Sequence, residues 1–232
     1  MLRVSKKNAI MLSLSYQSLG DFTGLPVVRK AIARGDRGLL VFDLPAFKKE
    51  ASIENLPHGV KLQKNDIPTS SPPSLSAVVA VMEVLHQYSQ TIFKNISHAV
   101  ELPWEKYLGE MHEFMASGKD ELRTIPPREP LPNEWSTLTI VMNSSKPQQA
   151  LVLFGTALSV FTEGMTVVPT GSDIDIESLS KIIGKPQGDW IVYYVRPNDD
   201  VFYIRTAGAL MTPLSTAEYA ERQRTKDVET AR

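Results

Sequence analysis

The sequence predicts an α+β fold, with a mixed, mainly antiparallel sheet in the C-terminal half and helices packed on that sheet. A helical hairpin and a small α/β unit are expected to precede it. Residues 190–196 and 201–205 are rich in β-branched and aromatic side chains and flank a Pro-Asn-Asp-Asp turn, which indicates a pair of strands. Residues 75–96 place apolar side chains three and four positions apart, which indicates a helix.

The small α/β unit is expected over residues 1–66. A strand is predicted at 9–16, because Leu12, Leu14 and Tyr16 alternate with serines as in a one-sided strand, and residues 25–33 fit a helix. Residues 39–42 form a short apolar run typical of a second strand. The basic start followed by apolar residues also resembles a signal peptide, but serines interrupt the apolar run. We therefore expect a retained segment.

The helical hairpin is expected over residues 75–123, between two proline-rich segments at 66–74 and 124–132. Neither segment can be a helix or a central strand, because proline lacks the backbone donor. The second helix is expected to begin at Pro103, since proline is tolerated in a first helical turn. It places aromatic, leucine and methionine side chains on one side before Gly118.

The C-terminal α+β domain is expected over residues 134–232. Strands are predicted at 136–142 and 166–168, and helices at 148–161 and 174–183, ahead of the strand pair. A nearly all-charged helix is expected at the end of the chain. The resulting order, βαβαββα, is typical of helices packed on a sheet.

The strand pair itself carries the clearest functional hint. Both of its arms are apolar at nearly every position, whereas a half-exposed strand alternates apolar and polar residues. Both faces are therefore expected to be covered, either by other layers of this chain or by a partner.

Composition excludes several classes of function. The chain of 232 residues is 42% hydrophobic and 22% charged, which is typical of a soluble globular protein. It has no cysteine, so disulfides, thiolate nucleophiles and iron–sulfur ligation are excluded. The net charge of -1 argues against a nucleic-acid partner, although the first 34 residues carry a local charge of +5 and leave nucleic-acid binding there as a third hypothesis. No run reaches the roughly 18 apolar residues of a spanning helix, and we expect a cytoplasmic protein with no transmembrane segment.

One motif resembles a metal-ligand spacing. Glu83 and His86 lie three residues apart on the long predicted helix, as in carboxylate-bridged di-iron bundles. Such sites need two copies, and none of the other three histidines has a glutamate at the same offset. We interpret His86 as a core histidine and expect no metal and no cofactor.

Candidate catalytic residues are few. His98 and His112 have glutamates nearby and could act as oriented bases. Asp173 and Asp175 are the other candidates for an enzyme site, as carboxylates that could hold a hard cation. The two aspartates also suit the start of a helix, where negative charge is favoured. None of these residues belongs to an ordered nucleophile or phosphate-binding motif.

The predicted elements carry more apolar surface than they can cover among themselves. This predicts a non-enzymatic adaptor or accessory subunit, bound to a protein partner in a hetero-complex or a homo-oligomer. The alternative is an enzyme, hydrolase-type or metal-assisted, whose site is assembled from residues distant in sequence. The residues expected to bind a partner are Trp104, Tyr107, Leu108, Met111, Met115, Trp190 and Tyr194.

Overall fold

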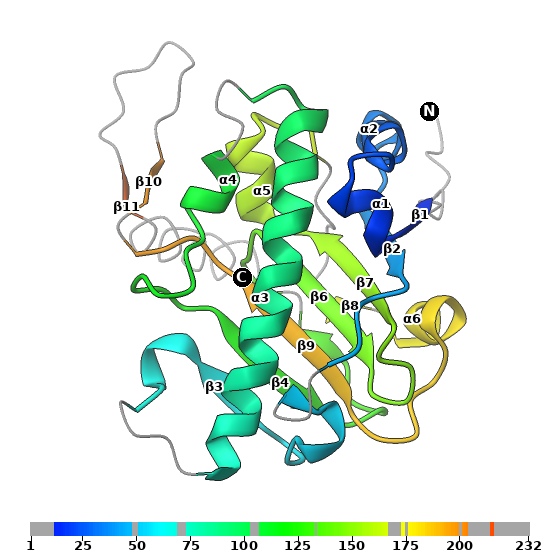
Figure 1. Ribbon diagram of the computed structural model, residues 1–232, viewed down its shortest axis with the longest axis vertical. Coiled ribbons are helices and arrows are strands. Elements are labelled where there is room, and N and C mark those ends of the chain that lie inside the picture. The colour runs from blue at the N-terminus through cyan, green and yellow to red at the C-terminus, as the bar shows by residue number, and fades with distance from the viewer. Residues whose placement is uncertain are drawn as a thin grey trace, which may run out of the picture.

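The computed structural model describes residues 12–47, 51–68, 73–102, 107–132, 134–166, 173–174, 176–199, 201–203 and 214–215. Within them, a seven-stranded sheet forms the centre of an α+β fold, as predicted (Figure 1). The first two strands in sheet order are parallel, and every other neighbouring pair is antiparallel. The sheet order is β1 (Leu12–Ser15), β2 (Gly38–Phe42), β7 (Gln149–Phe154), β6 (Leu138–Asn143), β9 (Trp190–Val195), β4 (Glu121–Ile125) and β3 (Lys61–Gln63).

Two short strand pairs lie outside this sheet. They join β5 (Leu131–Pro132) to β8 (Asp173–Ile174), and β10 (Phe202–Tyr203) to β11 (Leu214–Ser215). The described helices are α1 (Tyr16–Gly20), α2 (Leu25–Arg34), α3 (Pro73–Ala99), α4 (Tyr107–Glu110), α5 (Thr156–Phe161) and α6 (Ile176–Ile183), with 3-10 turns at Ile53–Asn55 and Lys64–Asp66. None of the helices described is both long and apolar enough to cross a membrane.

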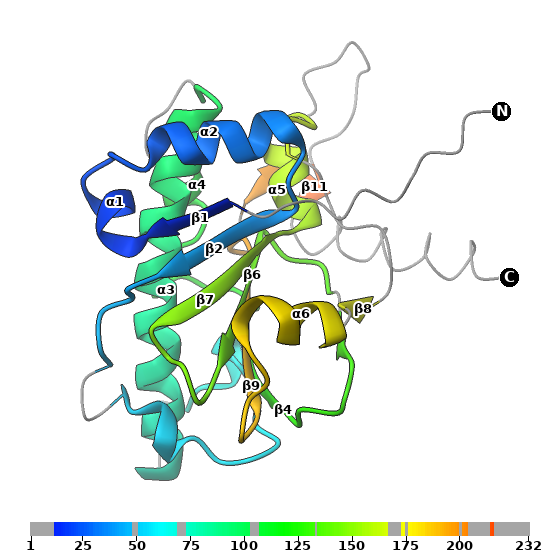
Figure 2. The same cartoon turned by 90° about the vertical axis from the view of Figure 1, so that its right-hand side faces the viewer.

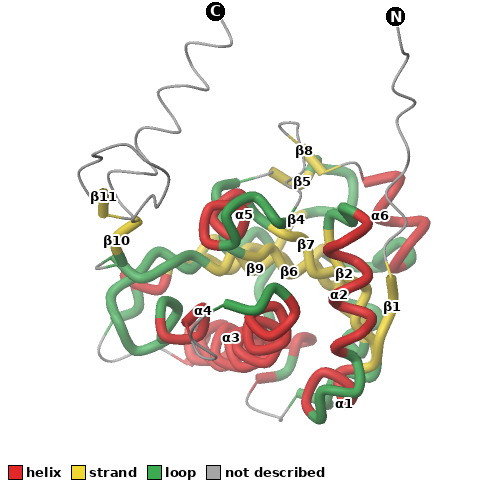
Figure 3. The backbone as a smooth tube through the Cα atoms, turned by 90° about the horizontal axis from the view of Figure 1, so that it is seen from above, coloured by secondary structure: helices red, strands yellow, loops and turns green. Residues whose placement is uncertain are grey.

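The long helix α3 covers one face of the sheet. Its apolar stripe packs on alternate residues of the central strands, including Ile140 of β6, Val152 of β7 and Tyr193 of β9. The opposite residues of the same strands, such as Val141 and Val192, belong to a second core that α6 closes. Figure 2 shows α3 and α6 on opposite sides of the sheet, and Figure 3 shows β5 and β8 on the side away from α3. Both faces are therefore buried by this chain.

The predicted pairing of 190–196 with 201–205 is wrong, although residues 190–195 are a strand. The neighbours of β9 are β4 and β6, while β10 pairs with β11. β9 is apolar at every position because it lies in the interior of a sheet covered on both faces, and all six of its residues are buried. A turn sequence indicates that the chain bends there, but it does not determine which strands pair with each other.

The predicted helix over 148–161 is also wrong for its first half. Residues 149–154 form β7, and only α5 is helical. An apolar run without alternation fits a strand buried on both faces as well as it fits a buried helix. Pairing with β2 and β6 decides between the two.

The three expected units are parts of one sheet. Strands from 1–66 pair directly with strands from 134–232 and from the expected hairpin, since β2 is hydrogen-bonded to β7 and β3 to β4. The expected hairpin over 75–123 contains α3, but the described part of α4 ends at Glu110 and residues 121–125 are the strand β4. Backbone pairing between distant segments therefore replaces the predicted division.

Gly155 shows how closely the chain packs where β7 ends. A Cβ at this position would lie 2.0 Å from the backbone oxygen of Ser136, a contact that side-chain motion cannot relieve. We expect Gly155→Ala to lower the free energy of unfolding by about 1–3 kcal/mol, as overpacking does. Gly20→Ala is the matched control, since nothing lies within 4 Å of its Cβ position. Urea denaturation of both variants checks this, and equal stabilities would contradict it.

Candidate active site

Asp120 is the centre of a buried polar cluster on the α3 face of the sheet. The residue directly precedes β4 and is fully buried. Its Oδ1 accepts the backbone N–H of Arg196 at 2.6 Å, and its Oδ2 accepts the Tyr193 hydroxyl at 3.1 Å. The Nδ1 atom of His86 lies 3.3 Å from the same Oδ2. These contacts bring together α3, β4 and β9.

Ionised Asp120 can only accept hydrogen bonds, and this fixes the state of His86. Nδ1 of His86 carries the proton that faces Asp120 and Tyr193. The Nε2 lone pair on the other side of the ring accepts from the Gln90 amide nitrogen at 3.0 Å. That amide is itself held in place, because it also donates to the His112 carbonyl at 2.7 Å. The His86 ring is thus held between the Asp120 carboxylate at Nδ1 and the Gln90 amide at Nε2.

Lys64 supplies a buried positive charge to the same cluster. Its Nζ lies 3.8 Å from Asp120 Oδ2 and donates to the Glu113 carbonyl at 3.2 Å. Burial alone would raise the pKa of Asp120, but the hydrogen bond from His86 and the charge of Lys64 outweigh it and hold that pKa below its ordinary value. Burial lowers the pKa of Lys64, and the negative charge of Asp120 opposes this.

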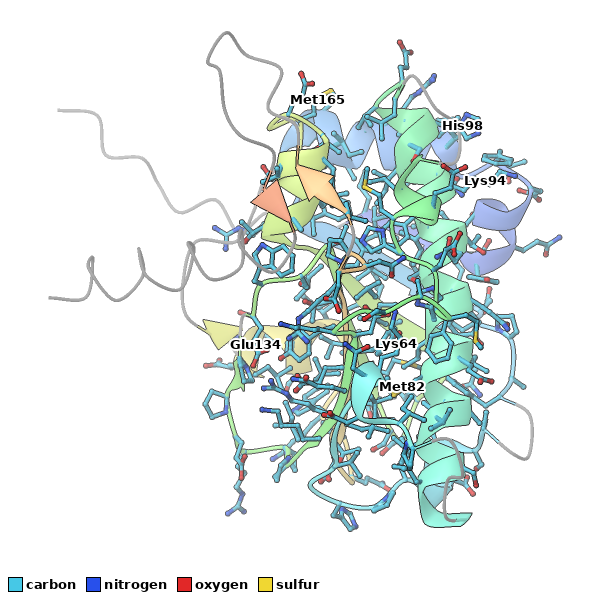
Figure 4. The ribbon with its side chains drawn as sticks, turned by 90° about the vertical axis from the view of Figure 1, so that its left-hand side faces the viewer. Lys64, Met82, Lys94, His98, Glu134 and Met165 are labelled. Carbon is cyan, nitrogen blue, oxygen red and sulfur yellow. The ribbon has the colours of Figure 1, made fainter. Side chains whose placement is uncertain are left out.

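A pocket of about 660 Å³ opens beside this cluster, between α3 and the segment 109–115. His86 and Gln90 line it from α3, and Phe114 faces the His86 ring at 5.2 Å between centroids. The other lining residues are Thr91, Lys94, Gly109, Glu110, Glu113 and Met115. In Figure 4, Lys94 lies further along α3 than Met82, and Lys64 lies between α3 and the sheet. A carboxylate-oriented histidine therefore lines an open pocket.

His112 lies behind the pocket and is fully buried. Its Nδ1 donates to the Leu108 carbonyl at 2.5 Å, and its Nε2 accepts from the Thr137 hydroxyl at 2.6 Å. The ring packs on Phe93 at 4.3 Å between centroids. Burial lowers the pKa of His112 to about 4, so it is a neutral packing group at neutral pH.

The opposite face of the sheet carries a network of two arginines and two glutamates. Arg123 of β4 pairs with Glu121 and Glu134, and Arg196, just after β9, pairs with the same two carboxylates. Both guanidinium groups lie over the Tyr194 ring, at 5.1 and 5.4 Å from its centroid. Figure 4 labels Glu134 on the side of the sheet away from α3.

The predicted catalytic residues do not gather in the structure. The ring of His98 packs edge-on against Phe22, whereas the ring of His112 contacts Phe93 and Phe161. The side chain of Asp173 and all of Asp175 lie outside the described residues. His86, interpreted as a core histidine, is indeed 4% exposed, but its partner Asp120 was missed. No local signal links the two, because they are separated by 34 positions and meet only through sheet packing.

Most residues predicted to bind a partner are buried in the chain itself. Leu108, Trp190 and Tyr194 are fully buried, and Met111 is 7% exposed. The apparent excess of apolar surface disappears because α3 and α6 cover both faces of the sheet. Met115 is 92% exposed, while Trp104 and the side chain of Tyr107 lie outside the described residues.

The fold is similar to that of a class of iron-dependent oxygenases. A full-length Neurospora crassa protein in complex with alpha-KG and 5-formyluracil has a TM-score of 0.60 and 9% identity, over 95% of this chain and 97% of its own. A putative 2OG-Fe(II) oxygenase family protein from Caulobacter crescentus has a TM-score of 0.53 and 10% identity, over 94% and 99% of the two chains. The dioxygenase for auxin oxidation 1 from Arabidopsis thaliana, bound to 2-oxoglutarate, has a TM-score of 0.51 and 10% identity, over 83% and 96%.

No family model and no curated protein sequence matches the chain. The likeness therefore rests on the fold. It overturns the prediction of a non-enzymatic adaptor or accessory subunit, because structures of like fold are described as an oxygenase and a dioxygenase. The alternative prediction, an enzyme with a site built from distant residues, is the one that these findings favour.

One of these proteins is described as a putative Fe(II) oxygenase, and the residues of this chain do not fit such a metal. Non-haem Fe(II) oxygenases hold their metal with two histidines and one carboxylate. Within the described ranges, no group of three or more histidine, aspartate or glutamate side chains could hold a metal ion. The chain has four histidines in all, at 58, 86, 98 and 112, and every one of them is described.

Proposed function

We propose that this chain is a hydrolase-type acid–base enzyme that acts in the pocket between α3 and residues 109–115. His86 is the general base, and Asp120 orients it. The single observation that supports this role is the buried Asp120 carboxylate, 3.3 Å from Nδ1 of a histidine that lines the pocket. The likeness of the fold to known oxygenases supports an enzymatic role without supplying this chemistry.

The proton steps follow from the hydrogen bonds. Nε2 of His86 has a lone pair directed at Gln90. A water molecule that displaces this amide gives its proton to Nε2 as the water oxygen bonds to the carbonyl carbon of an ester or amide. The imidazolium that forms is stabilised by Asp120, whose ionised state is maintained by Lys64 and Tyr193. His86 then returns the proton to the leaving oxygen or nitrogen as the bond between that atom and the carbonyl carbon breaks, which releases a carboxylic acid and an alcohol or amine.

The pocket lining indicates the kind of substrate. Phe114 and Met115 offer apolar contacts beside His86, while Lys94, Glu110 and Glu113 carry charges at the same pocket. Apolar walls with a few polar groups are typical of sites for small organic molecules. We therefore propose a small, partly apolar ester or amide as the substrate.

Hydrolysis of p-nitrophenyl acetate and p-nitrophenyl butyrate tests the role of His86. We expect His86→Gln to lower the rate by about 100-fold or more, the usual contribution of a positioned general base. His58→Gln is the matched control: His58 also lies beside a carboxylate, Asp189 at 3.1 Å, but its side chain is 87% exposed and lies outside the pocket. Its rate should equal that of the wild type.

Three further outcomes bear on the proposal. A chelator such as EDTA should leave the wild-type rate unchanged, because no step uses a metal. If the wild type and His86→Gln hydrolyse both esters equally, while circular dichroism shows that the variant is folded, His86 is not the base. Asp120→Asn should reduce the rate in the same direction, since an amide no longer stabilises the imidazolium.

A further inference from the structure

We infer that this chain, despite its oxygenase-like fold, binds no Fe(II) through two histidines and a carboxylate, and that an arginine–glutamate network fastens one face of its sheet without metal. The inference is independent of the role proposed for His86. It rests on a difference between this chain and proteins of similar fold: one of those proteins is described as a putative Fe(II) oxygenase, but the side chains of this chain do not fit that metal.

The four histidines cannot provide two ligands to one ion. Each neutral imidazole offers a single lone pair. At His112 that lone pair accepts from Thr137, and within the described residues no group of three histidine, aspartate or glutamate side chains could hold a metal ion. His58 lies beside Asp189 on the surface, and His98 packs against Phe22. The residues outside the described ranges include no histidine, so they cannot supply the second histidine ligand.

The carboxylates of the arginine–glutamate network are engaged as well. Glu121 accepts from Arg123 through Oε1 and from Gln63 through Oε2, the latter at 3.1 Å. Glu134 accepts from Arg123 through Oε1 and from Arg196 through Oε2, the latter at 2.5 Å. All four carboxylate oxygens are therefore hydrogen-bonded before any ligand arrives.

The two guanidinium groups also repel a cation. Arg123 is always protonated, and its hydrogen bonds to Glu121 and Glu134 raise its pKa further, although burial opposes this. The positive charges of Arg123 and Arg196 balance the negative charges of Glu121 and Glu134, so the network attracts no added divalent ion. Arg196 also donates to the carbonyls of Trp135 and Lys119. These bonds fasten β4, β9 and the segment before β6 to one another.

Metal retention by the purified full-length chain tests this inference. The protein is incubated anaerobically with Fe(II) and 2-oxoglutarate, desalted, and its iron content is measured by mass spectrometry of the metal. We expect trace iron only and no charge-transfer absorption from an iron-bound 2-oxoglutarate. The Tm should be the same with and without Fe(II), because only a ligand of the folded state raises it.

His58→Gln is the control for adventitious surface binding, since it removes the exposed pair with Asp189. The inference is supported if the wild type retains no iron. It is also supported if iron retained by the wild type is lost in His58→Gln. One iron per chain in both proteins, with a raised Tm, overturns it. Neither result decides whether His86 is the base, since ester hydrolysis is measured without iron.

Discussion

Arg196→Met is expected to lower the free energy of unfolding by about 3–5 kcal/mol, which is the usual cost of removing one partner of a buried ion pair. The side chain of Arg196 is 9% exposed and pairs with Glu121 and Glu134. Its loss leaves the buried carboxylate of Glu121 with less compensating charge, and it leaves the Trp135 and Lys119 carbonyls without this donor. Methionine replaces most of the volume, so the missing charge and hydrogen bonds dominate.

Lys181→Met is the matched control for this variant. Lys181 also forms an ion pair, with Glu177 at 2.7 Å, but both side chains are more than two-thirds exposed, at 71% and 78%. An exposed pair one helical turn apart contributes about 0.3–0.5 kcal/mol. Chemical denaturation of both variants gives the comparison. Similar losses in the two would show that burial of the Arg196 network contributes nothing.

Acid should destabilise the protein through His112. The folded-state pKa of this buried imidazole is about 4, against an ordinary value of 6.5 in an unfolded chain. Between these values the unfolded chain binds a proton that the folded chain does not, so the free energy of unfolding falls as the pH falls. The difference between the two pKa values corresponds to a contribution of about 3 kcal/mol to the free energy of unfolding. This contribution is fully present above pH 6.5 and is lost as the pH falls toward 4.

Urea denaturation at several pH values between 4 and 6.5 measures this effect. His112→Gln cannot take up the proton, so its stability should change less with pH than that of the wild type, whatever its absolute stability. His58→Gln, which removes an exposed histidine, should keep the wild-type slope. A wild-type slope in His112→Gln would mean that other groups cause the acid sensitivity.

Local patterns predicted several elements correctly. The strand β6 lies close to the predicted 136–142, and α3 includes the predicted 75–96. The helix α2 includes the predicted 25–33 and is followed by Gly35, whose φ of 70° is left-handed. These elements are set by residues that are neighbours in sequence, so periodicity and capping suffice.

The candidate site could not be predicted in the same way. His86 was visible as a histidine in an apolar helical stripe, which is the pattern of a core residue. Asp120 and Tyr193 become its neighbours only because β4 and β9 pair in register and α3 packs across them. No spacing in the sequence encodes that contact.

The sequence by itself determined the α+β class, the long amphipathic helix and the lack of cysteine chemistry, because composition and short-range periodicity fix these. Only the tertiary structure decided which strands pair, that both sheet faces are covered from within, and that an aspartate meets a histidine at a pocket. Backbone hydrogen bonds between strands are nearly the same for every side chain, so their partners are chosen by the packing of the whole core.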